Sequence, residues 1–165
     1  MPDLAKNDAI APCLWFDVQA EEAAKFYAGI FADSSVDKVW RAGDGLHIPA
    51  DTAMLVEFTL RGQPFQGLNG GPGYPHTQAM SLSVDCADQA EVDRIWDGLA
   101  ADGGSPVQCG WVKDRFGVSW QVVPRMMGEL QRSGTPAQVG RMMGAMMVMV
   151  KLDIAALQTA FAGDR

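Results

Sequence analysis

The sequence is short of positive charge. Its 165 residues include 13 lysines and arginines against 20 aspartates and glutamates, which gives a formal net charge of −7. No cluster of basic residues interleaved with aromatics offsets this balance. Because the phosphate backbone of a nucleic acid is an anion, such a chain would repel it. We therefore expect no nucleic-acid partner.

Cysteine and histidine are also scarce. The three cysteines, Cys13, Cys86 and Cys109, form no CxxC pair, and their odd number argues against a disulfide framework and against a cysteine-based zinc site. Free thiols are typical of a reducing compartment, so we expect a cytoplasmic protein. The two histidines, His47 and His76, fall in predicted loops without the spacing of metal ligands.

Long hydrophobic runs are absent. The longest, residues 142–150, is too short to cross a bilayer and is interrupted by Gly144. The first eight residues contain no basic segment followed by an apolar core, so they do not resemble a signal peptide. The length fits one domain with its own core, and we expect no membrane segment.

The first half of the chain has the pattern of one strand, one amphipathic helix and three further strands. The strands are predicted over residues 9–16, 34–42, 53–60 and 63–68, and the helix over residues 20–31. A turn-rich segment separates the second and third strands, Arg61-Gly62 turns the chain before the fourth, and residues 69–73 form the closing loop.

The same order then recurs. A strand is predicted over residues 79–85, a helix over 88–101, and strands over 105–112 and 117–124, with Gly117 supplying the positive φ of the last hairpin. A shift of 69 residues superposes matching side chains in the two helices: Glu22 on Glu91, Phe26 on Ile95, Tyr27 on Trp96, Gly29 on Gly98, Ile30 on Leu99 and Asp33 on Asp102. This favours a duplicated α+β fold of two βαβββ modules, over about residues 9–73 and 79–124.

The remaining residues, about 125–162, are predicted to be a helical tail. Thr135 before Pro136 is typical of a helix start, and a last helix is expected between Asp153 as its cap and Gly163 as its stop. A methionine-rich stripe at residues 142–150 has three interpretations: helix core, dimer surface, or an adaptable wall facing a ligand.

Several stretches together resemble a known family. They are Leu14-Trp15-Phe16-Asp17, Glu22-Ala23-Ala24 with Phe26-Tyr27, Leu68-Asn69-Gly70-Gly71-Pro72, Cys109-Gly110-Trp111, Phe116-Gly117-Val118-Ser119-Trp120-Gln121, and Lys151, Asp153, Ile154 and Leu157 at the end. The sequence resembles the PhnB-like proteins of the vicinal-oxygen-chelate (glyoxalase, bleomycin-resistance and dioxygenase) superfamily over about residues 10–162. The run from Phe116 to Gln121 and the Asn-Gly-Gly-Pro loop are its specific parts.

The resemblance implies two βαβββ modules that curl into an open barrel, with C-terminal helices and a ligand groove, and it implies a homodimer. Catalytic members of the superfamily hold a divalent metal, a Lewis acid, with His, Glu or Gln from the first and last strand of each module. Here those positions fall near Pro12, near Ala79, between Gln66 and Leu68, and on Gln121. Because a catalytic ion needs several His or carboxylate ligands, we expect no metal and no other cofactor.

The candidate pocket residues follow from the predicted strands. Period-2 alternation puts Trp120 and Gln121 on opposite sides of their strand and leaves the side of Trp111 open. If Gln121 keeps the ligand position that the resemblance implies, it points into the groove and Trp120 packs under a helix. A cavity lined by Trp111, Phe65 and Gln121 would suit a planar or apolar ligand, with Asn69, Gln121 and Ser81 as polar partners. Cys109 is a further candidate, although no histidine near it in sequence could act as its base.

Three functions remain open, in this order: a metal-free module that binds a small molecule, an enzyme with a non-standard, metal-independent pocket, and a structural homodimer. No catalytic residue is assigned. Members of the family are often labelled demethylubiquinone methyltransferases. A methyltransferase that uses S-adenosylmethionine would need a doubly wound sheet with a glycine-rich turn, which this strand order does not supply.

Overall fold

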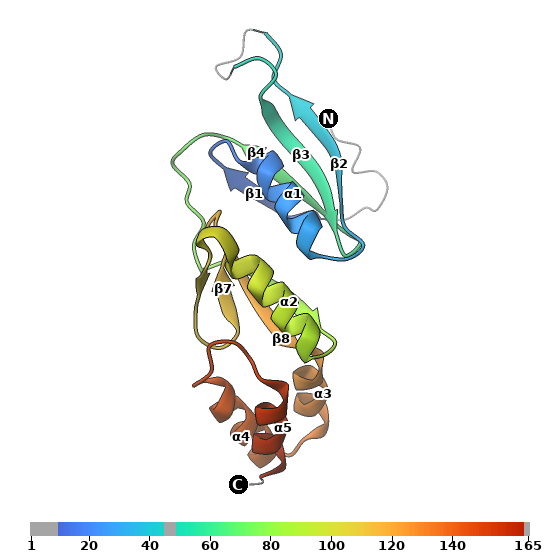
Figure 1. Ribbon diagram of the computed structural model, residues 1–165, viewed down its shortest axis with the longest axis vertical. Coiled ribbons are helices and arrows are strands. Elements are labelled where there is room, and N and C mark those ends of the chain that lie inside the picture. The colour runs from blue at the N-terminus through green and yellow to red at the C-terminus, as the bar shows by residue number, and fades with distance from the viewer. Residues whose placement is uncertain (1–9, 45–48, 164–165) are drawn as a thin grey trace. The chain divides into compact units, whose positions relative to one another are not determined.

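A computed structural model describes residues 10–44 and 49–163, so His47 and Ala9, the first residue of the predicted first strand, lie outside the described part. The chain divides into two compact units, residues 1–75 and 76–165. Each unit contains one four-stranded sheet and one long helix (Figure 1). Each is described below by itself.

The first unit contains β1 (Cys13–Phe16), α1 (Ala20–Ile30), β2 (Ser35–Arg41), β3 (Ala53–Leu60) and β4 (Gln63–Asn69). Its strands lie in the order β1-β4-β3-β2; β1 runs parallel to β4, and the other pairs are antiparallel. Arg61 and Gly62, with φ of 48° and 78°, form the predicted turn between β3 and β4. The predicted βαβββ order of this module is confirmed.

Helix α1 covers one face of this sheet (Figure 1). Its buried residues are Ala20, Ala23, Ala24 and Tyr27, which recur at the spacing of one helix face. The buried strand residues Val56, Phe58 and Phe65 alternate with half-buried ones, as expected of a sheet with one covered face. Gly67 lets the helix approach closely, since a Cβ there would lie only 3.2 Å from that of Ala20.

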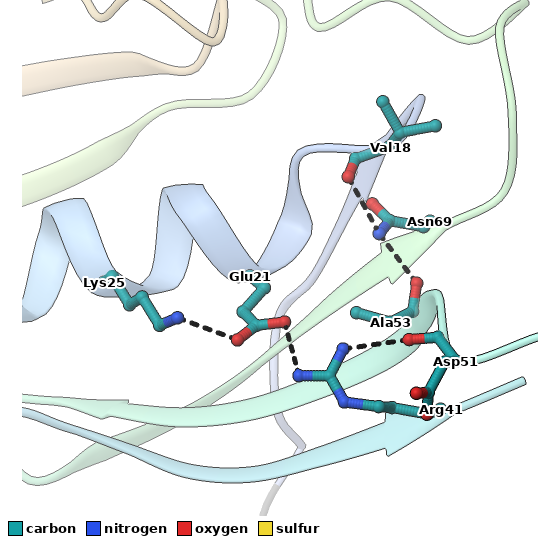
Figure 2. Close-up of polar contacts among 7 residues, drawn as sticks. All are labelled: Val18, Glu21, Lys25, Arg41, Asp51, Ala53 and Asn69. Carbon is teal, nitrogen blue, oxygen red and sulfur yellow. Dashed lines mark hydrogen bonds and ion pairs between the residues drawn. The ribbon is translucent and has the colours of Figure 1, made fainter.

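Asn69, at the end of β4, bonds to three backbone groups on two other segments, and Figure 2 shows its bonds to Val18 and Ala53. Its Oδ1 accepts a hydrogen bond of 2.8 Å from the N–H of Ala20, and its Nδ2 donates to the carbonyls of Val18, at 3.1 Å, and Ala53, at 2.8 Å. The helix has no side-chain cap from its own N-cap residue. Asn69 therefore satisfies an N–H at the start of α1 from across the fold.

An exposed polar group links α1 to β2 (Figure 2). Glu21 accepts hydrogen bonds from Lys25, at 2.8 Å, and from Arg41, at 3.0 Å, and Arg41 also donates to the carbonyl of Asp51. The pKa of Glu21 is lowered chiefly by the hydrogen bond from Lys25. The hydrogen bond from Arg41 and the positive charges of both residues lower it further. Because these side chains are exposed to solvent, their ion pairs add little to the free energy of unfolding. They do join the first turn of α1 to β2.

The second unit contains β5 (Leu82–Cys86), α2 (Gln89–Ala100), the 3-10 turn η2 (Ala101–Gly103), β6 (Ser105–Pro106), β7 (Trp111–Lys113) and β8 (Ser119–Pro124). The strand order β5-β8-β7-β6 repeats that of the first unit. The predicted single strand over residues 105–112 is wrong, because the structure has two short strands there. Cys109 and Gly110, with φ of 61° and 78°, reverse the chain between them.

The duplication predicted from the 69-residue shift is visible in the backbone. Asp33 and Asp102, which the shift superposes, both adopt left-handed φ, of 50° and 52°, just after their helices. Tyr27 and Trp96, another superposed pair, are both buried. The α+β fold of two βαβββ modules is thus confirmed, and each of its sheets is open, with β1 and β2 or β5 and β6 at the edges.

A buried carboxylate fixes the hairpin between β7 and β8. Asp114, which is 1% exposed, accepts hydrogen bonds from the N–H groups of Phe116 and Val118 and, at 2.8 Å, from the indole Nε1 of Trp120. Gly117, with φ of 89°, completes the turn as predicted. Trp120 is therefore held by its polar edge as well as by burial.

The tail forms α3 (Arg125–Ser133), α4 (Pro136–Met146) and α5 (Ile154–Ala162). Both predicted caps are confirmed: Thr135 and Gln138 form a capping box, and Asp153 accepts from the N–H of Ala156. The three helices share a small core of Met127, Met142, Leu152 and Leu157. No helix in the described ranges is long and apolar enough to cross a membrane.

Gln89, at the start of α2, holds the tail in place. Its Nε2 donates to the carbonyl of Leu152, at 3.2 Å, and its Oε1 accepts from the N–H of Ile154, at 2.8 Å. Lys151 forms ion pairs with Asp93 and Asp97 of α2. Burial alone would lower the pKa of Lys151, but its hydrogen bonds to Asp97 and Asp93 outweigh this and raise it.

We expect Asn69→Ala to lower the free energy of unfolding by about 3 kcal/mol, because three backbone groups would lose their buried partner. Urea denaturation of the purified chain measures this value. Gln63→Ala removes an exposed amide from the other end of the same strand, and this control should change stability by less than about 0.5 kcal/mol. Equal effects of the two substitutions would contradict the role given to Asn69.

Gln89→Ala should loosen the tail. Both of its backbone partners lie in residues 152–154, so their amides and those of the following turn should exchange hydrogen faster, while amides of β8 keep their protection. Hydrogen exchange followed by mass spectrometry measures the change. Gln158→Ala, which removes an exposed amide from α5, is the matched control and should leave the exchange pattern unchanged.

Candidate functional site

The second unit contains a pocket of about 390 Å³. Its floor is the face of the sheet that α2 leaves uncovered, represented by Asp85, Trp111, Gln121 and Val123. Its walls come from the tail. The pocket therefore exists because the chain continues past β8 and folds back over the open face.

Gln121 and Trp111 lie beside each other on this floor. They are register partners on β8 and β7, so both side chains leave the sheet on the same side. The neighbouring Trp120 is 2% exposed and lies on the other face, which confirms the alternation predicted for this strand. The side of Trp111, left open by the sequence, is thereby settled.

Ser81 orients Gln121. The amide Nε2 of Gln121 donates a hydrogen bond of 2.8 Å to the hydroxyl of Ser81, just before β5. Within the part of the chain that the structure describes, the Oε1 of Gln121 has no hydrogen-bond donor. The pocket thus presents a fixed, neutral acceptor that a bound molecule can use.

The walls are rich in methionine. Met127 from α3 and Met143 and Met146 from α4 line the pocket, together with Leu152. The methionine stripe is divided between two environments, because Met142 lies in the tail core while Met143 and Met146 line the pocket. Long, unbranched thioether side chains adapt their shape to a ligand.

Cys109 also lines the pocket, at the tight turn between β6 and β7. Its thiol sulfur lies 3.8 Å from the carbonyl oxygen of Met147 and 3.8 Å from the sulfur of the same residue. Neither group is a base that could take up the thiol proton. The surroundings of Cys109 therefore suit packing and soft contacts rather than nucleophilic attack.

Two arginines of α3 line the pocket, and sequence reasoning missed them. Neither Arg125 nor Arg132 forms an ion pair with any residue that the structure describes. Their spacing of seven residues would have placed them on one helix face, but α3 itself was predicted only as part of a helical tail. Asp85 is the one carboxylate among the described lining residues.

The two remaining candidates lie in the first unit and are engaged there. Phe65 is 8% exposed and stacks on Phe58, with ring centroids 5.5 Å apart, on the face covered by α1. Both polar atoms of the Asn69 side chain already bond to backbone groups. The structure thus gathers Gln121, Trp111 and Cys109 at one pocket, with Ser81 behind Gln121.

The open face of the first sheet carries a different row of side chains. Cys13, Gln66, Glu57 and Lys38 are successive register partners across its four strands. The Oε1 of Glu57 is buried without a hydrogen-bond partner among the described residues. Partial burial raises the pKa of the Cys13 thiol. The alternation of Glu57 with the buried Val56 and Phe58 is a sequence signal that could have placed Glu57 on this open face.

The side chains at the transferred ligand positions do not fit the metal site that the superfamily resemblance implies. At the transferred positions, Pro12 and Ala79 have no metal-binding side chain, and Gln121 is bonded to Ser81. Gln66 stands between one thiol and one carboxylate. Across the described ranges, no three or more His, Cys, Asp or Glu side chains come together in a way that could hold a metal. No step of a reaction is therefore derived through a metal.

The sequence pattern of the family described as 3-demethylubiquinone-9 3-methyltransferase matches residues 8–123. Comparison with curated proteins gave no match.

Solved structures match as well. A structure described as a putative 3-demethylubiquinone-9 3-methyltransferase, PhnB protein, from Bacillus cereus is 31% identical; the match covers 69% of this chain and 97% of that one, with a TM-score of 0.64. Protein PA1353 from Pseudomonas aeruginosa is 26% identical over 67% of this chain and 92% of its own, with a TM-score of 0.56. A glyoxalase/bleomycin resistance protein from Albidiferax ferrireducens T118 is 13% identical over 68% of this chain and 95% of its own, with a TM-score of 0.44.

The residue match spans well over half of the chain, and the structure repeats the βαβββ order that the resemblance implies. The chain therefore belongs to the 3-demethylubiquinone-9 3-methyltransferase family, and it is similar to a PhnB protein of that description.

Proposed function

We propose that this protein binds a small organic molecule in the pocket of its second unit, without the metal used by catalytic members of the superfamily. One observation carries the proposal: Gln121, Trp111 and Cys109, three of the pocket candidates chosen from the sequence, line the same pocket. Its volume of about 390 Å³ lies within the range of small-molecule sites, which is roughly 300–1,000 Å³.

The arrangement of the lining supports binding of a partly apolar molecule. The indole of Trp111 offers a flat apolar surface, and the methionine side chains opposite can move to fit its outline. The Oε1 of Gln121 offers one directed hydrogen bond at the floor. A pocket with apolar walls and few placed polar groups is the common form of a ligand site.

Binding is favoured over catalysis because of what surrounds the reactive side chains. The thiol of Cys109 contacts Met147 rather than a base, and Gln121 and Ser81 are neutral and bonded to each other. The family description names a methyltransferase. Neither sheet is doubly wound, which leaves that activity without the usual site for its methyl donor. The homodimer and the cytoplasmic location stay predictions.

We expect at least one member of a panel of small aromatic and aliphatic compounds to raise the melting temperature of the EDTA-treated protein, because a ligand of the folded state stabilises it by mass action. Isothermal titration then gives the affinity of each such compound. Gln121→Ala and Trp111→Ala should each weaken binding by about tenfold, the loss expected for one directed contact in a pocket.

Gln66→Ala is the matched control. It removes the same side chain from the corresponding strand of the first unit, also half-buried and on the face away from the helix, and should leave the affinity unchanged. A panel without any stabilising compound would contradict the proposal. So would binding that is lost in Gln66→Ala and kept in Gln121→Ala, or binding that returns only when a divalent metal is added.

A further inference from the structure

We propose that the ligand of this pocket is a small organic anion, with a planar or otherwise apolar body and one carboxylate or phosphate group held between Arg125 and Arg132. The proposal rests on the proposed function, since it names the class of molecule that the same pocket would take. It follows from the charge, the spacing and the surroundings of the two arginines.

The charge of the pocket is opposite to that of the chain. The protein as a whole carries a formal charge of −7, yet the residues that line this pocket include two exposed arginines and one acidic residue, Asp85. Neither arginine is neutralised by an ion pair with a described residue. In an acidic protein, two unpaired cations at one pocket favour an anionic ligand there over a neutral or cationic one.

The spacing of the arginines suits one shared anion. Seven residues on an α-helix are nearly two full turns, so Arg125 and Arg132 leave α3 on the same side, about 10 Å apart along its axis. Their long side chains can converge on a group placed between them. A guanidinium presents paired N–H donors that match the oxygens of a carboxylate or a phosphate.

Gly128 lies between the two arginines and leaves room for this convergence. It lines the pocket, and a Cβ built on it would lie 3.4 Å from Nη1 of Arg132, close enough to crowd the guanidinium. The absence of a side chain at this position lets the guanidinium of Arg132 lie along the helix surface. A β-branched residue at 128 would force it away.

The start of α3 adds to the same preference. Pro124, Arg125, Met127 and Gly128, at the first turn, all line the pocket. This turn contains no acidic residue, and no side chain caps it. The partial positive charge of an uncapped helix N-terminus therefore acts in the same direction as the two arginines.

The rest of the lining is suited to the apolar body of the ligand. Trp111 and Val123 belong to the floor, and Met143 and Met146 to the wall. A molecule with its charged group near α3 and its ring near Trp111 would bring a donor group within reach of Oε1 of Gln121. An inorganic ion would use only the first of these contacts, so the complete pocket selects an organic anion.

Two probes of nearly equal shape test the class: 2-naphthoate, which is an anion, and 2-naphthamide, which is neutral. With the EDTA-treated full chain at about 20 mM salt, 2-naphthoate should bind about tenfold more tightly, as expected for a charge-assisted hydrogen bond. Raising the salt to about 0.3 M should narrow the difference, because salt screens the attraction. Isothermal titration measures both affinities.

Arg125→Gln and Arg132→Gln should each weaken binding of 2-naphthoate severalfold and leave binding of 2-naphthamide unchanged. Arg94→Gln, which removes an exposed positive charge from α2, is the control and should change neither. Circular dichroism confirms that each variant is folded. A double variant of Arg125 and Arg132 that still prefers the anion would overturn the proposal.

The outcomes separate this inference from the function on which it rests. If both probes bind equally and both are lost in Trp111→Ala, the pocket is a ligand site and the preference for anions is wrong. If 2-naphthoate binds with the same affinity in Trp111→Ala, it binds elsewhere, and both proposals fail for this class of ligand. If neither probe binds, the anion proposal is overturned, and the compound panel decides the function.

Discussion

Each sheet of this protein has two faces, and its own helix can cover only one of them. Side chains alternate along a strand, so residues such as Phe58 and Trp120 are buried under α1 or α2, and their neighbours Glu57 and Gln121 leave on the opposite side. That second face must meet something else. In the second unit it meets the C-terminal helices, and the space left between them is the pocket.

Sequence patterns located most elements because their signals are local. The cap of α5 at Asp153 and the capping box of α4 depend on side chains within three or four residues, and the side of Gln121 depends on simple alternation. The repeat was also visible, because duplicated helices keep the same buried face. The matched left-handed Asp33 and Asp102 show that the shift of 69 residues aligns backbone conformation as well as side chains.

What the sequence did not reveal depends on contacts between distant residues. The chain reversal at Cys109 and Gly110 places Cys109, a residue other than glycine, at positive φ. The backbone N–H groups of Cys109 and Gly110 donate to the carbonyls of Met149 and Val150 in the tail, and these long-range bonds account for the reversal. Asn69 was chosen as a ligand contact, whereas its amide caps α1 from 49 residues away. The arginines of the pocket were missed since they become neighbours of Gln121 only once α3 has folded back.

The pocket therefore has two parts with different origins. Its floor, with Trp111 and Gln121, lies within residues 8–123, the stretch that matches the family. Its walls, with both arginines and the methionines, begin at Pro124 and belong to the tail. The side chain of Gln89 and the ion pairs of Lys151 hold the tail to α2, so the position of the walls depends on contacts between residues far apart in the sequence. The proposed preference for an anion is accordingly a property of the C-terminal helices rather than of the sheet, and a change in the tail would alter it while leaving the sheet intact.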